Sequence, residues 1–239
     1  MYLENVVVDA TDPQALGRFW EAALGSETLT DELAGFETRL AVPDGPVLDL
    51  CFQRVPEPPL EPQRLHLDLR GGAAVESTVE RLLALGARRA DIGQGQVAWE
   101  VLADPEGNPF CVVQDRAAYA ETGPIATLPL DVADPDREHD FWQWLTGWVS
   151  VEGSGPRSLQ HPSRRGPLLE LCAEVVPKGP AKNRMHLDLR LEPDDDADAL
   201  ALEIAGRGGR ELHFDWGDLP WRHFADPSGN EFCLLPSRG

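Results

Sequence analysis

Two short stretches place histidine, aspartate and arginine at alternate positions of an apolar run. Residues 64–70 read RLHLDLR and residues 184–190 read RMHLDLR. In an extended chain alternate side chains share one face, so His66, Asp68 and Arg70 lie together and the leucines point the other way. Because the leucines need a helix to cover them, we expect the polar trio on the open face of a sheet. Each copy therefore predicts a pocket that holds three polar side chains.

The repetition extends well beyond these two stretches. Residues 6–25 match residues 128–147, and WEVLADPEGNPFCVV at 99–113 matches WRHFADPSGNEFCLL at 221–235. The landmarks keep one order and a spacing of 120 to 122 residues, which is too long for a solenoid repeat. The sequence therefore predicts two tandem homologous domains, with a boundary near 116–124, where a polar, Gly/Pro-ended stretch lies.

Each repeat contains a smaller unit that restarts once. Asp12 is a good helix N-cap with Pro13 at the first helical position, and Gly25 ends the apolar helical pattern. A β-branched strand precedes this helix, and strand patterns follow it at 36–42 and 47–53. The second half of the repeat begins again with a strand, 64–70, and a helix, 73–85, followed by strands near 97–102 and 109–114. The order strand–helix–strand–strand–strand is thus predicted four times in the chain.

Three motifs in this order resemble the vicinal oxygen chelate superfamily, in particular its glyoxalase-like and bleomycin-resistance-like members. The motifs are D-x-x-D-P…FW…LG, HLDLR and W-x-x-x-A-D-P-x-G-N-x-F-C. The resemblance implies an α+β fold of two glyoxalase-like domains, 1–116 and 122–239. Each would consist of two βαβββ modules whose sheet forms a cupped half-barrel, with the helices outside. It leaves open whether modules pair within or across the domains, and whether the chain is a monomeric internal pseudo-dimer or a homodimer.

Strand alternation assigns further side chains to the concave faces. Asp9 and Asp131 lie on the open face of the first strand of each repeat, whereas Trp99 and Trp221 are on strands where either face is open to them. The predicted ligand-binding residues are His66, Asp68, Arg70, Gln53, Asp9, Trp99, His186, Asp188, Arg190, Asp131 and Trp221. An alternative is that the histidines are structural and that Asp9 pairs internally with Asp68 and Arg70.

Metal-dependent members of the superfamily hold a divalent ion with two histidines and two carboxylates from the first and last strands of paired modules. Carried over by motif position, the candidate ligands are His66, Asp49 and Cys111 in the first repeat and His186, Glu170 and Cys233 in the second. Asn5 and Cys111 depart from the family pattern. Aspartate, histidine and cysteine form a zinc-type ligand set, but cysteine in a strand also behaves as a small hydrophobic residue. We expect that no cofactor is required, with a divalent metal as the alternative.

Charge and composition exclude several classes of function. The net charge of −20 opposes nucleic-acid binding, because it repels the phosphate backbone. No apolar run has the length of a membrane span, and the N-terminus lacks the basic and apolar regions of a secretory signal, so we expect a cytoplasmic protein. The four cysteines are too few for a disulfide framework and are expected to be reduced thiols.

Two hypotheses for function follow from these residues. The first is a protein that binds a small organic molecule in a concave pocket without the usual four metal ligands. The alternative is a lyase, isomerase or dioxygenase-type enzyme that uses a non-standard site of histidine, carboxylate and cysteine.

Overall fold

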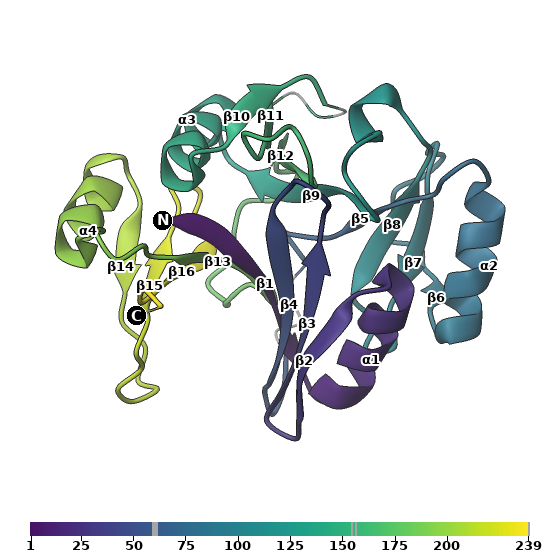
Figure 1. Ribbon diagram of the computed structural model, residues 1–239, viewed down its shortest axis with the longest axis horizontal. Helices are drawn as coiled ribbons and strands as arrows, with labels where there is room; N and C mark the ends of the chain where they lie inside the picture. The colour runs from purple at the N-terminus through teal and green to yellow at the C-terminus, as the bar shows by residue number, and fades with distance from the viewer. Residues whose placement is uncertain (59–61, 154, 156, 239) are drawn as a thin grey trace.

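The structure, a computed structural model, describes residues 1–58, 62–153, 155 and 157–238. Its elements form four modules of one strand, one helix and three strands (Figure 1). Module 1 consists of β1 (Tyr2–Ala10), α1 (Pro13–Leu24), β2 (Glu27–Glu32), β3 (Gly35–Ala41) and β4 (Val47–Arg54). Module 2 consists of β5 (Asp68–Arg70), α2 (Val75–Leu85), β6 (Arg88–Arg89), β7 (Glu100–Ala103) and β8 (Pro109–Val113).

The second repeat supplies the other two modules after a 3₁₀ helix, η1, at Ala117–Tyr119. Module 3 consists of β9 (Ile125–Val132), α3 (Pro135–Thr146), β10 (Val149–Val151), β11 (Arg157–Gln160) and β12 (Leu168–Ala173). Module 4 consists of β13 (Met185–Arg190), α4 (Ala197–Gly206), β14 (Arg210–Leu212), β15 (Arg222–Ala225) and β16 (Glu231–Leu235). The predicted α+β fold of four βαβββ modules is confirmed.

The modules form two eight-stranded sheets, and each sheet joins one module from each repeat. Sheet A has the strand order β14-β15-β16-β13-β1-β4-β3-β2, and sheet B has the order β10-β11-β12-β9-β5-β8-β7-β6. In the middle of each sheet two first strands pair antiparallel, β1 with β13 and β5 with β9. Figure 1 shows β1, in purple, beside β13, and the yellow β16 from the other end of the chain lies next to β13. Module pairing, which the sequence left open, therefore crosses between the repeats.

The concave faces of the two sheets are called cup A and cup B below. Cup A is built from modules 1 and 4, and cup B from modules 2 and 3. The division of the chain into domains 1–116 and 122–239 stays a prediction about the repeats, because each sheet contains strands from both of them.

The helices begin and end at the residues that local chemistry favours. In α1 the Asp12 carboxylate accepts a hydrogen bond from the Ala15 amide, Pro13 opens the helix, and Gly25 closes it in the left-handed conformation. The equivalent helix of the second repeat, α3, has the same arrangement around Asp134 and Gly147. These ends fix the helices against the outer faces of the sheets.

One large hydrophobic core lies under the helices and contains the leucines of both HLDLR stretches. Leu65, Leu67 and Leu69 are buried there, as strand alternation predicts. Trp20 belongs to the same core, and its indole N–H donates to the carboxylate of Asp104, 3.1 Å away, in the turn before β8. The polar residues between the leucines therefore lie on the concave side.

The main differences from the predicted elements concern β2, β5 and β6, and the sequence did not indicate the two-residue strand β6. β2 was not predicted, because Leu29 is the one apolar residue of its sequence, ETLTDE. The strand is mostly exposed and pairs with β3. The predicted strand 64–70 is shortened to β5, and only an isolated bridge joins Leu65 to Leu130. Among the described residues no helix is long and apolar enough to cross a membrane.

Candidate functional site

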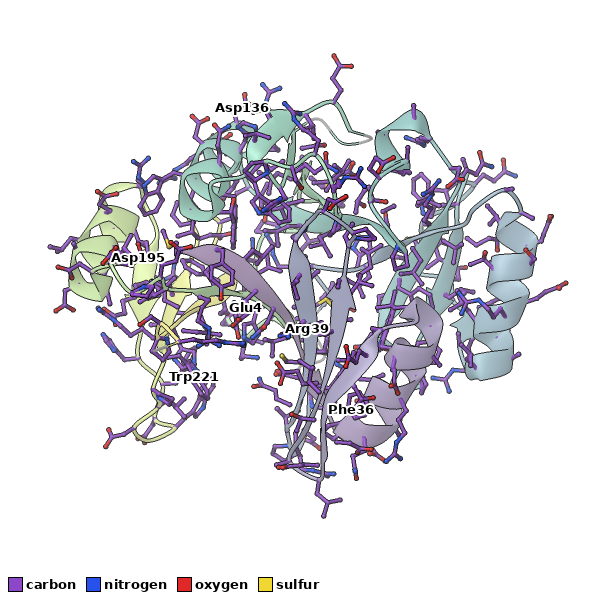
Figure 2. The ribbon with its side chains drawn as sticks, viewed as in Figure 1. Glu4, Phe36, Arg39, Asp136, Asp195 and Trp221 are labelled. Atoms are coloured by element: carbon purple, nitrogen blue, oxygen red, sulfur yellow. The ribbon has the colours of Figure 1, made fainter. Side chains whose placement is uncertain are left out.

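Cup A contains a cavity of about 600 Å³ between the concave face of sheet A and the segment 213–221, which joins β14 to β15. This segment projects from the sheet in Figure 1, and Figure 2 places Trp221 at its base. A cavity of this size accommodates a small organic molecule. The side chains that line it include Asp9, Lys182, His186, Asp188, Trp216 and Trp221.

The structure divides the predicted ligand-binding residues between the two cups. Those that line the cavity of cup A are Asp9, Gln53, His186, Asp188, Arg190 and Trp221. Those that lie in the modules of sheet B are His66, Asp68, Arg70, Trp99 and Asp131. Because the modules pair across the repeats, residues of one repeat contribute to both cups.

A cluster of buried polar atoms lies in the wall of cup A. The ligand atoms of His186, Asp188 and Cys233 all lie within 4.8 Å of one another. His186 Nε2 is 3.3 Å from Asp188 Oδ1, and Asn5 Nδ2 donates to Asp188 Oδ2 at 3.3 Å. Within the described part of the chain, His186 Nδ1 and Asn5 Oδ1 are buried without a hydrogen-bond partner, and Asp188 Oδ1 is buried with the imidazole contact at 3.3 Å but no further hydrogen bond. Buried polar atoms are normally paired, so these three atoms point to a ligand or ion.

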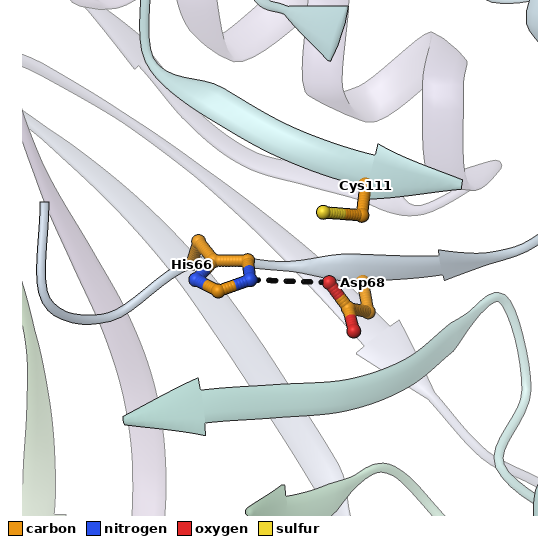
Figure 3. Close-up of side chains that lie close together, drawn as sticks. All are labelled: His66, Asp68 and Cys111. Carbon is orange, nitrogen blue, oxygen red and sulfur yellow. Dashed lines mark ion pairs between the residues drawn. The ribbon is translucent and has the colours of Figure 1, made fainter. Parts of the chain in front are cut away.

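Cup B repeats this cluster with His66, Asp68 and Cys111 (Figure 3). His66 Nε2 is 3.3 Å from Asp68 Oδ1, the same distance as in cup A. Thr127 takes the place of Asn5 and donates its hydroxyl to Asp68 Oδ2 at 3.1 Å. His66 is more exposed than His186, with 29% against 6% of its side chain accessible.

The carboxylates proposed as metal ligands from motif position do not join these clusters. Asp49 lies in sheet A, apart from His66 in sheet B, and it is fully buried in a bidentate ion pair with Arg39 at 2.8 and 2.6 Å. Glu170 lies in β12 of sheet B, whereas His186 lies in sheet A. In both cups the carboxylate beside the histidine is instead the aspartate of the same HLDLR stretch. The modules pair across the repeats, so Asp49 and Glu170 each lie in a different sheet from the histidine with which the motif positions grouped them.

The cysteines are free thiols, and their surroundings keep them protonated. Burial, and next the neighbouring Asp188 carboxylate, raises the pKa of the Cys233 thiol. Burial and Asp68 raise the pKa of Cys111 in the same way, and burial raises that of Cys172 to about 12. In the absence of a metal ion these thiols are therefore poor nucleophiles at neutral pH.

The charged residues of cup A are paired differently from the alternative considered from sequence. Asp9 accepts from Lys182 at 2.8 and 2.9 Å and from Gln53 at 2.6 Å. Arg190 pairs with Glu4 at 2.6 Å, and in sheet B Arg70 pairs with Asp115 at 2.6 Å. Asp9 is thus neutralised within the cup by a lysine, rather than through Asp68 and Arg70.

The cavity residues that the sequence argument missed include Lys182, His223 and Trp216. Lys182 is one of two lysines in the chain, and its rarity was the signal that could have drawn attention to it. His223 lies on β15, where the aligned residue of the other repeat is Val101. Trp216 lies in the segment 213–221, where the repeats diverge. Differences between otherwise matched repeats would have indicated all three.

An open curved sheet of two βαβββ modules around a concave site defines a protein of the vicinal oxygen chelate superfamily. The family model described as glyoxalase-like domain matches residues 5–113 and again residues 127–235. The chain therefore belongs to the glyoxalase-like domain family. Among curated proteins, none matches the sequence.

Solved structures are similar to this chain in fold. Glyoxalase I from Zea mays is 18% identical, with 98% of this chain and 92% of that chain covered and a TM-score of 0.67. A Bacillus subtilis subsp. subtilis str. 168 protein, provisionally described as a dioxygenase, is 15% identical, with coverages of 100% and 86% and a TM-score of 0.62. A glyoxalase/bleomycin resistance protein/dioxygenase family enzyme from Burkholderia phytofirmans PsJN is 17% identical, with coverages of 48% and 98% and a TM-score of 0.39.

Proposed function

We propose that the chain binds a small organic molecule in cup A. The observation that carries this proposal is the cavity of about 600 Å³, which combines an aromatic rim with buried, unpartnered polar atoms in its wall. Ligand sites are concave and mostly apolar, with a few placed polar groups, and cup A has this composition. The binding function requires no metal ion.

A neutral fluorescent probe tests the proposal. N-phenyl-1-naphthylamine titrated into the protein is expected to bind at one equivalent per chain with increased emission. The substitution Leu219→Arg places a charged side chain at the rim of the cavity and should abolish this binding. Its matched control is Val97→Arg, the aligned position beside cup B. Binding that survives Leu219→Arg, or that is lost equally in both variants, would overturn the assignment to cup A.

A metal site is the second candidate function, favoured by the clusters of histidine, aspartate and cysteine. Imidazole, carboxylate and thiolate are zinc ligands, and the buried Asp188 Oδ1 and the unpartnered His186 Nδ1 are consistent with a missing partner. His186, Asp188 and Cys233 would hold the ion in cup A. When bound, such an ion supplies a Lewis acid that polarises a substrate oxygen. In either case Asn5 orients the Asp188 carboxylate through its hydrogen bond.

Elemental analysis decides whether this second function holds. Protein purified without chelator or affinity metal is expected to contain zinc in stoichiometric amounts if the clusters bind it, and to lose thermal stability when a chelator removes the ion. The Cys233→Ser variant should then retain about half of the zinc, because the cluster of cup B is unchanged. Less than about 0.1 equivalent of any transition metal, together with no stabilisation by added zinc, would exclude the metal function.

A further inference from the structure

The rim of cup A presents an aromatic wall. The rings of Phe214 and Trp216 stack with centroids 4.1 Å apart and planes 7° apart, and His223 meets both rings edge-on at 5.2 Å. The Trp221 indole N–H donates to His223 Nε2 at 3.2 Å. Burial lowers the pKa of His223, so its ring is neutral at neutral pH and accepts this bond. Hydrogen bonding and stacking therefore hold these four rings in place.

Part of this wall is exposed to solvent without serving the core. Trp216 is 50% exposed and lines the cavity, although a tryptophan is a large apolar side chain. An exposed aromatic face in a concave site favours a planar ring that stacks on it. The first requirement on the ligand is therefore a flat aromatic group.

The polar wall of the cavity sets the second requirement. Two buried oxygens of this wall, Asp188 Oδ1 and Asn5 Oδ1, only accept hydrogen bonds. Among the described residues Asn5 Oδ1 has no donor, and Asp188 Oδ1 has His186 Nε2 at 3.3 Å. Because Asn5 Nδ2 is already used on Asp188, the amide cannot turn its donor to the ligand without losing that bond. The group that reaches this wall must therefore donate hydrogen bonds.

The charges around the cavity favour a cation over a neutral donor. Carboxylates already neutralise two of its cationic side chains, with Asp9 on Lys182 and Glu4 on Arg190. Arg54 lies at the exposed edge and donates to the backbone carbonyls of Thr11 and Leu33. Asp188, by contrast, faces a histidine, an amide and the neutral Cys233 thiol, and it has no arginine or lysine partner among the described residues. A charge-assisted hydrogen bond to this carboxylate is stronger than a neutral one.

We infer that the ligand of cup A is a planar aromatic compound carrying a protonated amine, with its ring on Trp216 and Trp221 and its ammonium group on Asp188 and Asn5. This inference rests on the proposed binding function of the same cup. In this inference the aromatic segment 213–221 selects the planar ring of the ligand. The HLDLR strand of module 4 selects its positive charge.

Three probes of similar size test the two requirements separately by calorimetric titration. 1-Naphthylmethylamine has the ring and the amine, 1-naphthoate has the ring and a negative charge, and cyclohexylmethylamine has the amine without a planar ring. We expect 1-naphthylmethylamine to bind about tenfold or more tightly than either of the others. Asp188→Asn should remove the preference for the amine, while its matched control in cup B, Asp68→Asn, should leave the preference unchanged.

A second variant keeps the test valid should Asp188→Asn fail to fold. Trp216→Leu changes an exposed residue and should weaken both naphthyl probes several-fold without affecting cyclohexylmethylamine. If 1-naphthoate binds cup A as tightly as the amine, the ligand class is wrong while the proposed binding function stands. If the Leu219→Arg substitution changes the affinity of none of the probes, the binding function itself fails.

Discussion

Cup A and cup B have the same HLDLR strand but differ in what covers it. In cup A the side chains of β15 and β16 that face the concave side line the open cavity: His223, Cys233 and Leu235. The aligned residues of cup B belong to an apolar cluster instead: Val101, Cys111 and Val113. Tyr119, from the segment that joins the repeats, packs into this cluster and is 1% exposed. Tyr119 thus covers the concave face of cup B at the positions where cup A has an open cavity.

This difference separates the duplicated scaffold from the site. The histidine, aspartate and cysteine of each cluster are repeated, with the same 3.3 Å contact between imidazole and carboxylate. The cups differ at aligned positions of the two repeats: His223 aligns with Val101, and Glu4 aligns with Ala126. Glu4 and Ala126 both lie at an irregularity in the pairing of the central strands. The shared motif is therefore evidence for a common fold. The open cavity and the unshared residues around it distinguish cup A from cup B as a binding site.

Removal of the covering tyrosine should produce the largest effect. Tyr119→Ala is expected to lower the free energy of unfolding by about 3 kcal/mol, because it deletes a fully buried aromatic ring. It should also open cup B, so that the variant binds two equivalents of N-phenyl-1-naphthylamine. Urea unfolding and fluorescence titration measure the two effects. The matched control is Tyr2→Ala, at the other tyrosine of the chain, which is 40% exposed and should have little effect. A variant as stable as Tyr2→Ala would show that Tyr119 does not cover cup B.

The sequence predicted the fold well because its signals are local. Asp12, Pro13 and Gly25 mark the ends of a helix, and strand alternation alone places His66 opposite Leu65 and Leu67. The pairing of modules across the repeats is a long-range property that these local patterns do not encode. For this reason Asp49 was grouped with a histidine that lies in the other sheet. Residues 213–220 follow no repeating pattern, so strand alternation could not place Phe214 and Trp216 over the cavity, whereas Trp221, which aligns with Trp99, was predicted.

A second difference between the repeats lies on the buried faces of α1 and α3. Substitutions there should have an intermediate effect on the free energy of unfolding. The buried Leu16 of α1 corresponds to Glu138 in α3, which is also fully buried. Burial, and next the Asp226 carboxylate, raises the pKa of Glu138 to about 8, although Ser228 donates a hydrogen bond to it at 2.5 Å. Between pH 4.5 and 8 the folded protein therefore holds a proton that the unfolded chain releases. Stability should fall as the pH rises through this window, and level off above it.

Substitution by the residue of the other repeat tests this. Glu138→Leu is expected to increase the free energy of unfolding at pH 8 by about 2 kcal/mol, because an apolar side chain replaces a buried carboxyl group. The gain should shrink toward pH 4.5, where the glutamic acid is protonated in both states. The reverse change, Leu16→Glu, should destabilise the protein and introduce the same pH dependence. Parallel stability curves for Glu138→Leu and the unsubstituted protein between pH 4.5 and 8 would contradict the assignment.

The smallest expected effect concerns the helices that cover the two cups from outside. Asp196 caps α4 by accepting from the amides of Asp198 and Ala199, whereas the aligned N-cap of α2 is Ala74, which has no side chain that can accept a hydrogen bond. Ala74 has an extended conformation, as an N-cap residue requires, with φ at −143°. Ala74→Asp should therefore add about 1 kcal/mol, and Asp196→Ala should remove a similar amount. Because α2 covers sheet B, hydrogen exchange should slow in α2 on Ala74→Asp and leave α4 unchanged. Equal slowing in both helices would mean that the two repeats unfold as one cooperative unit.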